Sequence, residues 1–244
     1  MTDETTIPDV SVVIPCYNAE RWVGRAIDSV LAQEGVTVEV IVIDDGSTDG
    51  SVDVLRRYED RIRWETGPNR GACAARNRGL ALARADYVMF LDADDYVEGP
   101  FLSAAVERMH ARCADIAFGC IETEVAGKRK PYYLQADEDA TSVMRAFLTH
   151  GFVPPCGTVW SKQHLQQLGG WKEGLRRHQD YELAFRALST APNIAIFSSG
   201  RGIYFQHDIG TRISSKTDAE TVKDQAETIR FVARCLNASD LTQR

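Results

Sequence analysis

Apolar positions in the first hundred residues follow two alternating periodicities. Short, nearly continuous apolar runs at 10–14, 38–43 and 85–91 predict strands buried on both faces of a sheet. Between them, residues 19–33 and 70–84 have helical patterns, the first with one apolar face and the second rich in alanine. A helix opened by residues 47–49 and a shorter strand at 62–65 complete this part of the chain.

Strands that alternate with helices at this spacing predict βαβ units and a mainly parallel sheet. Ligands bind beyond the carboxyl ends of the strands in such sheets. Here those ends carry three polar segments, at 15–18, 44–47 and 92–95. We therefore expect segments that lie dozens of residues apart to converge on one edge of the sheet.

The second half has a less regular pattern. It predicts strands at 115–122, 131–134 and 194–197, a turn at 126–128, a loop at 151–157, and helices at 138–149, 161–168 and 179–188. Val222, Ile229, Ala233 and Leu236 predict a C-terminal amphipathic helix. We interpret 1–244 as one α/β domain with a Rossmann-like, mainly parallel sheet and a smaller mixed region. Its expected parts are a ligand-binding half at 8–112, a second half at 113–215 and the terminal helix at 216–244.

Composition restricts the ligands. The chain has 244 residues, 44% of them hydrophobic, and a formal net charge of −7. A general nucleic-acid binder would need a basic surface, so nucleic acid is not an expected partner. A diphosphate ligand would need a metal ion or a few well-placed basic groups.

The six cysteines form no C-x-x-C pair, and the N-terminal segment has no basic and apolar regions of a secretory signal. Apolar runs such as 87–91 are too short to cross a bilayer. These observations favour reduced thiols and a cytoplasmic location, with peripheral membrane contact left open.

Asp92-Ala93-Asp94, directly after a strand, is a D-x-D arrangement. Two carboxylates at this spacing reach one hard cation, and Mg²⁺ or Mn²⁺ takes one or two carboxylates together with phosphate oxygens. A solvated acidic loop is the alternative for an isolated D-x-D, but the neighbouring polar strand ends favour the metal site. For Asp95 we expect a cap on a following helix.

Asp45, in Asp44-Asp45-Gly46-Ser47, has two interpretations: a turn and helix start, or a carboxylate that accepts a hydrogen bond from a base or sugar. Neither G-x-G-x-x-G after the first strand nor a P-loop motif occurs. Dinucleotide-binding and P-loop proteins are therefore disfavoured.

The segments SVVIPCYNAERWVGRAIDSVLAQ, VEVIVIDDGSTDGS and GPNRGACAARNRGLALARADYVMFLDADD resemble glycosyltransferase family 2 in content and order. The resemblance implies the GT-A fold and an inverting transfer from a nucleotide-diphosphate sugar, usually UDP-linked, with Mn²⁺ or Mg²⁺. By position it places Pro15 and Tyr17 along the nucleoside, Asp45 at the base, and Arg76 beside base and diphosphate. Asp92 falls near the ribose and Asp94 on the metal.

The second half resembles the family more loosely. Asp180 matches the family's catalytic base, although Gln179 stands where a glutamate is usual; a helix cap is the alternative for Asp180. The helix dipole is expected to keep Asp180 ionised. His207 matches a loop that can add a metal ligand, although a structural histidine is the commoner case. Trp160 and Trp171 are interpreted as core residues rather than as a platform for a sugar.

The expected partners are the nucleotide sugar and a hydroxyl acceptor, which could be a glycan, a lipid-linked glycan or a small molecule. The processive Q-x-x-R-W signature is missing, so a polymer synthase is disfavoured. Two alternatives stay open: a metal-dependent phosphohydrolase or phosphotransferase, and a catalytically silent module that binds nucleotide sugars.

Overall fold

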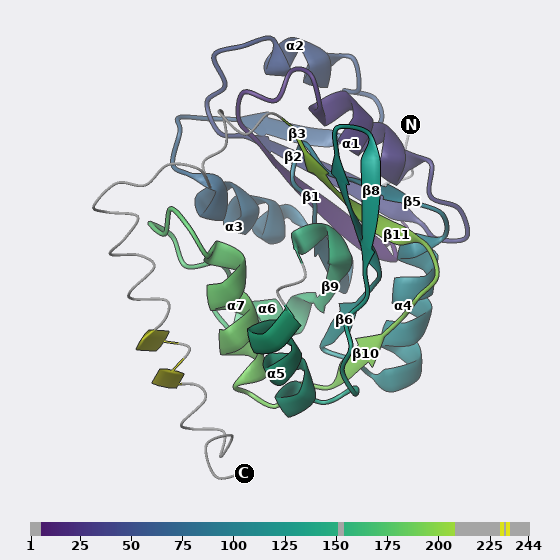
Figure 1. Ribbon diagram of the computed structural model, residues 1–244. Helices are drawn as coiled ribbons and strands as arrows, with labels where there is room; N and C mark the ends of the chain where they lie inside the picture. Colours follow the sequence, from purple (N-terminus) through teal and green to yellow (C-terminus); the bar gives the residue numbers. More distant parts are fainter. Residues whose placement is uncertain (1–5, 151–153, 208–229, 232, 235–244) are drawn as a thin grey trace.

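A computed structural model describes residues 6–150, 154–207, 230–231 and 233–234. Within these residues the main sheet has the order β10-β6-β9-β4-β1-β2-β3 (Figure 1). Its strands are β1 (Val10–Cys16), β2 (Val38–Asp44), β3 (Arg63–Thr66), β4 (Tyr87–Phe90), β6 (Ile116–Phe118), β9 (Thr158–Ser161) and β10 (Ile194–Ile196). Neighbouring strands run parallel except at β9, which is antiparallel to both β4 and β6. The expected mainly parallel α/β sheet is confirmed.

A second, four-stranded sheet has the order β5-β11-β7-β8. It consists of β5 (Tyr96–Glu98), β11 (Arg201–Gln206), β7 (Ile121–Val125) and β8 (Lys128–Tyr132). The edge strand β8 carries Lys128, Lys130 and Pro131, residue types that discourage pairing with another chain. Because β5 follows the D-x-D segment directly, this sheet brings β11 close to the carboxyl ends of the main sheet.

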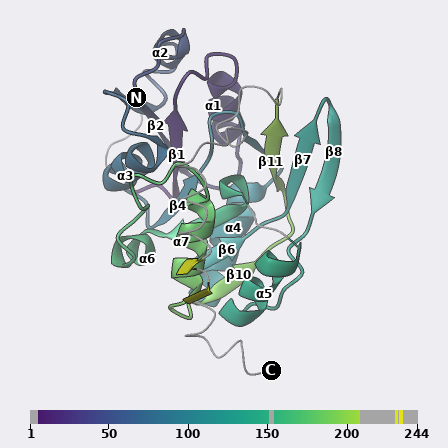
Figure 2. The same ribbon diagram turned by 60° about the vertical axis from the view of Figure 1, so that its left-hand side comes forward.

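Helices cover both faces of the main sheet (Figure 1, Figure 2). α1 (Val23–Leu31) and α4 (Phe101–Arg112) lie on one side, and α3 (Ala72–Leu82) and α7 (Gln179–Leu188) on the other. The remaining helices are α2 (Ser51–Arg56), α5 (Ala140–His150), η1 (Pro155–Gly157) and α6 (Lys162–Gln167).

The core is centred on β1, whose residues Val12, Val13 and Ile14 are fully buried. Helix α3 packs directly on this strand through Gly79, where an added Cβ would lie 2.2 Å from a methyl carbon of Val13. Close packing of this kind fixes the height of α3 above the sheet, and with it the position of Arg76 one turn earlier.

Several elements differ from the sequence-based expectations. Strands β5, β9 and β11 were not predicted, and the helix expected after Asp95 begins only at Phe101, as α4. The run 115–122 forms two strands, β6 and β7, because the chain leaves the main sheet after Phe118 and enters the second sheet at Ile121. Of the predicted C-terminal helix, only residues 230–231 and 233–234 lie within the described part, and they are helical.

Candidate active site

The three polar segments converge as expected. In the β1–β2 pair Cys16 is opposite Asp44, and the Asp45 N–H donates to the Cys16 carbonyl at 2.8 Å. Asn18 N–H donates to Ser47 Oγ at 2.9 Å, which joins the first segment to the second. On the other side of β1, Leu91 N–H donates to the Val13 carbonyl at 3.0 Å, so the D-x-D segment leaves the sheet at the same edge.

Asp45 is buried beneath the loop that leads into α3. Its Oδ1 accepts the Arg70 N–H at 2.7 Å and its Oδ2 accepts the Gly71 N–H at 2.8 Å. Gly71 has φ of 92°, a conformation that favours glycine. Asp45 therefore shapes the start of α3, a role that differs from both the turn at 44–47 and the ligand contact considered from the sequence.

Arg76 is the buried centre of the site, with 5% of its side chain exposed. Its Nη2 donates to Asp92 Oδ1 at 2.6 Å and its Nη1 to Gln179 Oε1 at 2.8 Å. The guanidinium carbon lies 4.4 Å from the ring centroid of Trp171. Burial acts to lower the pKa of Arg76, but the charges of Asp92 and Asp180 raise it, so the residue stays cationic.

Asp180 lies in the first turn of α7, as predicted, and its carboxyl is buried. Burial raises the pKa of this carboxyl to about 6, with Arg76 opposing the shift and Asp92 adding to it. Its Oδ1 is buried and has no hydrogen-bond partner among the described residues. At neutral pH a carboxyl with this pKa is still mainly ionised, although its pKa lies above the usual value and not below it, as a helix dipole alone would place it. A pKa near 6 suits proton acceptance at neutral pH.

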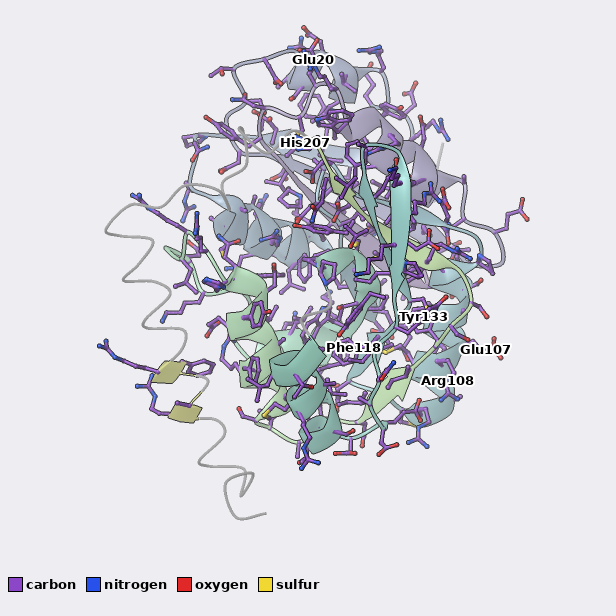
Figure 3. The ribbon with its side chains drawn as sticks, viewed as in Figure 1. Glu20, Glu107, Arg108, Phe118, Tyr133 and His207 are labelled. Atoms are coloured by element: carbon purple, nitrogen blue, oxygen red, sulfur yellow. The ribbon has the colours of Figure 1, made fainter. Side chains whose placement is uncertain are left out.

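Asp94 and His207 meet although they are 113 residues apart in the sequence. His207 Nε2 lies 3.0 Å from Asp94 Oδ2, and both side chains are partly exposed, at 24% and 30%. Figure 3 labels His207 at the end of β11. Its ring stacks on Trp22 with 5.4 Å between centroids. Burial and the charge of Asp92 raise the pKa of Asp94, while His207 opposes the rise.

Asp95 does not cap a helix, so that expectation is wrong. The chain continues into β5 instead, and Asp95 is fully buried, with Oδ1 accepting the Phe205 N–H at 2.9 Å. Burial and the charges of Asp94 and Asp92 raise its pKa well above the usual value. Asp95 thus ties the D-x-D segment to β11, which carries His207.

Two further residues predicted for the site, Pro15 and Tyr17, lie at the carboxyl end of β1. Pro15 is part of β1 and partly exposed, whereas the side chain of Tyr17 beyond the strand is 48% exposed. Trp160 and Trp171 are buried, as expected of core residues; Trp171 packs edge-on against Phe90.

The residues at Asp94 fit a hard divalent cation. The acidic segment 92–95 has two carboxyl groups with raised pKa values, which a nearby cation would lower. Groups of three or more His, Cys, Asp or Glu side chains suited to a metal do not occur in the described part of the chain. A cation at Asp94 and His207 would thus take its other ligands from water and diphosphate oxygens, as Mg²⁺ and Mn²⁺ commonly do.

Comparison with protein families decides the relationship. The family model described as glycosyl transferase family 2 matches residues 11–168. The chain belongs to this family. The succinoglycan biosynthesis protein ExoO of Rhizobium meliloti is 34% identical over 215 residues, which are 81% of this chain and 61% of ExoO. GlyA, a glycosyltransferase of Streptococcus pneumoniae, is 34% identical over 113 residues, 45% of this chain and 16% of GlyA. The chain thus spans less than two thirds of either relative.

Two solved glycosyltransferase-type structures, bound to nucleotide sugars, share the fold. The S. aureus TarS 1–349 structure in complex with UDP-GlcNAc superposes with a TM-score of 0.77 at 21% identity, over 93% of this chain and 66% of TarS 1–349. The mannosyltransferase PcManGT of Pyrobaculum calidifontis, in complex with GDP-Man and Mn²⁺, gives 0.64 at 16% identity, over 98% of this chain and 77% of that one. The fold is GT-A, as the sequence resemblance implied.

Three residues of the site had no recognised role in the sequence. Gln179 was noted only as a departure from the family pattern, yet it binds Arg76. Trp22 and Arg25 lie near the start of α1 and contact β11 through Phe205. Their helical spacing gave no signal, because both contacts depend on a strand 180 or more residues later in the chain.

In the described part of the chain no helix has the length and apolarity to span a bilayer.

Proposed function

We propose that this chain transfers a sugar from a nucleotide-diphosphate donor, UDP-linked, to a hydroxyl acceptor with inversion at the anomeric carbon. The observation that carries the proposal is the cluster around Arg76, which joins Asp92 at a strand end to the N-terminus of α7, where Asp180 lies. Family membership supports the reaction class, and the TarS complex with UDP-GlcNAc supports a UDP-linked donor.

In the proposed reaction Asp180 accepts the proton of the acceptor hydroxyl. The acceptor oxygen forms a bond to the anomeric carbon while the bond from that carbon to the diphosphate breaks, and the nucleoside diphosphate leaves on the opposite face. A buried carboxylate with a pKa of about 6 is ionised at neutral pH, yet basic enough to take the proton. General-base help of this type contributes on the order of 10²–10⁴-fold.

Donor binding is assigned to the strand ends. Pro15 and Tyr17 would lie along the nucleoside, Asp45 at the base, Asp92 near the ribose, and Arg76 beside the diphosphate. The site residues fit Mn²⁺ or Mg²⁺ held by Asp94 and His207, and an imidazole ligand favours Mn²⁺. Such a cation, when bound, would neutralise charge that develops on the leaving diphosphate.

A cytoplasmic location belongs to the same proposal. The described cysteines 16, 73, 113, 120 and 156 are all unpaired, which suits a reducing compartment.

The test is a product analysis with UDP- and GDP-sugars, with and without Mn²⁺, in the presence and absence of a panel of hydroxyl acceptors. Transfer, or slow Mn²⁺-dependent release of the nucleoside diphosphate without acceptor, would support the proposal. Release of inorganic phosphate from a simple phosphate ester would favour a phosphohydrolase or phosphotransferase instead. Donor binding with neither transfer nor hydrolysis would favour a silent binding module.

A further inference from the structure

Arg25 connects helix α1 to three other parts of the candidate cation site. It lies in the first turn of α1, and its Nη2 donates to the backbone carbonyl of Asp94 at 2.7 Å. Its guanidinium carbon is 4.3 Å from the ring centroid of Tyr96 in β5 and 4.1 Å from that of Phe205 in β11. One side chain from α1 therefore contacts the D-x-D segment, strand β5 that follows it, and strand β11 that pairs with β5.

The rings around Arg25 lead directly to His207. Trp22, on the same helix end, packs against Phe205 with 5.0 Å between centroids and stacks on the His207 ring at 5.4 Å. The Phe205 backbone N–H is held by Asp95 at 2.9 Å. The position of His207 relative to Asp94 thus depends on how β11 lies against the 94–95 segment, and Arg25 contacts both sides of that junction.

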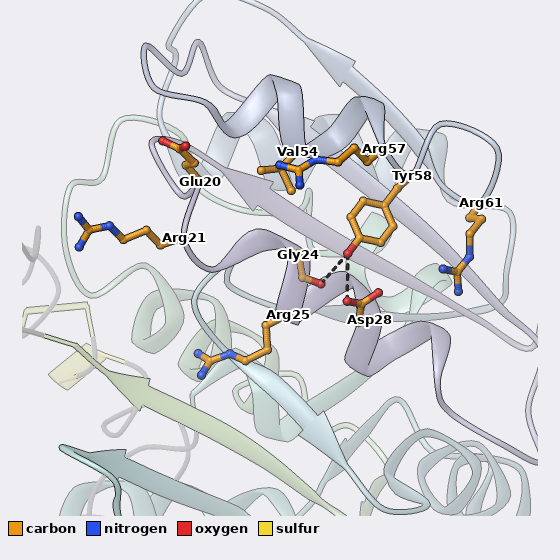
Figure 4. A pocket seen from close by; sticks show the side chains of 9 residues that line it. All are labelled: Glu20, Arg21, Gly24, Arg25, Asp28, Val54, Arg57, Tyr58 and Arg61. Carbon is orange, nitrogen blue, oxygen red and sulfur yellow. Dashed lines mark hydrogen bonds between the residues drawn. The ribbon is translucent and has the colours of Figure 1, made fainter.

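Arg25 also borders a groove of about 660 Å³ between α1 and α2. Its guanidinium, however, contacts Asp94, Tyr96 and Phe205, which do not line that groove. In Figure 4 its guanidinium lies apart from the hydrogen-bonded pair of Tyr58 and Asp28 and reaches toward the strands. Arg21 borders the same groove and is exposed, which makes it a matched control on the same helix end.

We propose that Arg25 is a positioning residue for the divalent cation. It contacts the Asp94 backbone and the Phe205 ring, and these contacts keep Asp94 and His207 facing one another. This inference rests on the proposed function. A planar guanidinium can stack between two rings while it donates in its own plane, and a lysine ammonium cannot do both. Residues that orient metal ligands in this way typically change metal affinity by about 10–100-fold when they are removed.

The test is a titration of the full chain with Mn²⁺ in which electron paramagnetic resonance measures the concentration of the free ion. UDP or GDP is present, whichever the wild type binds more tightly. Arg25→Gln should raise the apparent Mn²⁺ dissociation constant by about tenfold or more. Arg25→Lys should recover only a minor part of that loss, and Arg21→Gln should stay within about twofold of the wild type. The unfolding midpoint in chelator is recorded alongside, because a general loss of structure would move it and a local change at the cation would not.

Equal Mn²⁺ affinity in the wild type and Arg25→Gln would overturn the inference, and so would full recovery by Arg25→Lys. If Arg25→Gln does not fold, Phe205→Leu carries the test, since it removes one stacking ring and keeps the N–H bonded to Asp95; the same rise is expected, and unchanged affinity would refute the role. A wild type that binds Mn²⁺ no better with nucleotide than without would instead contradict the proposed function itself.

Discussion

Arg76 and Gln179 are joined by a 2.8 Å hydrogen bond from the guanidinium Nη1 to the amide Oε1. The bond links α3 to the residue that precedes Asp180, while Nη2 of the same guanidinium binds Asp92. Gln179 is neutral. The groups that raise the pKa of Arg76 most are therefore the carboxylates of Asp92 and Asp180. The amide therefore orients Arg76 without adding a carboxylate beside the proposed base.

Replacement of Gln179 by glutamate tests how the charges around Arg76 set the pKa of Asp180. A carboxylate at this position adds like charge near Asp180 and draws on Arg76, and both effects raise the pKa of Asp180 further above its present value of about 6. The acidic limb of kcat/KM against pH should move upward by roughly 0.5–1 unit. Gln167→Glu, on the exposed part of α6, is the control and should leave the limb in place. An unchanged or lowered limb in Gln179→Glu would contradict this electrostatic arrangement.

Asp180→Asn should separate donor binding from turnover. The amide keeps the shape of the side chain but cannot accept the acceptor proton, so we expect kcat to fall on the order of 10²–10⁴-fold. Calorimetric titration with the nucleotide should show affinity close to that of the wild type. Near-normal turnover would remove Asp180 from the proposed mechanism.

The same substitution should stabilise the folded chain at alkaline pH. The pKa of Asp180 rises from 3.8 to about 6 on folding, so the folded state binds this proton more tightly than the unfolded state. Between these two pH values the unfolded state loses the proton first, and the contribution of Asp180 to stability falls as pH rises. Asp180→Asn removes that cost, and at pH 8 it should raise the free energy of unfolding by about 1–3 kcal/mol.

Urea unfolding at pH 8 and pH 4 measures this effect. The gain should be present at pH 8 and nearly absent at pH 4, where the wild-type carboxyl is largely protonated in the folded state. A gain of equal size at both pH values would show that burial of charge is not its cause.

Arg76 should be far more important to stability than its neighbour Arg78. Arg76→Met leaves Asp92 and Asp180 without their buried cation, which typically costs about 3–5 kcal/mol. Arg78 lies two residues along the same helix, and its exposed guanidinium pairs with Glu65, so Arg78→Met should leave the free energy of unfolding close to that of the wild type. Denaturant unfolding of both variants provides the comparison, and equal losses would contradict the role assigned to Arg76.

The sequence predicted the parallel half of the fold because its strands are apolar on both faces and end in turn residues. Val10–Cys16 and Val38–Asp44 are examples, and the convergence of their polar ends follows from topology alone. The antiparallel strand β9 has only four residues and follows a loop of glycines and prolines, so its local pattern gave no signal. The cap expected at Asp95 was wrong because the chain enters β5, a three-residue strand that is defined by its pairing with β11.

The contacts of the site depend on tertiary structure to a greater degree. Asp94 was predicted from its D-x-D spacing at a strand end and His207 only by resemblance, and their 3.0 Å approach arises from the pairing of β11 with β5. The raised pKa of Asp180 could not be read from its place in a helix, because burial beside Arg76 and Asp92 decides it. The role of Arg25 needed the same strands to be in place.

The most direct test of the central claim is calorimetric titration of UDP into the wild type and Asp94→Ala, each in Mn²⁺ and in chelator. The wild type should bind UDP at least about tenfold more tightly in Mn²⁺, a difference of about 1.4 kcal/mol, and Asp94→Ala should lose that difference. Equal UDP affinity of the wild type in Mn²⁺ and in chelator, or a Mn²⁺ effect that survives in Asp94→Ala, would contradict a cation–diphosphate site at these strand ends.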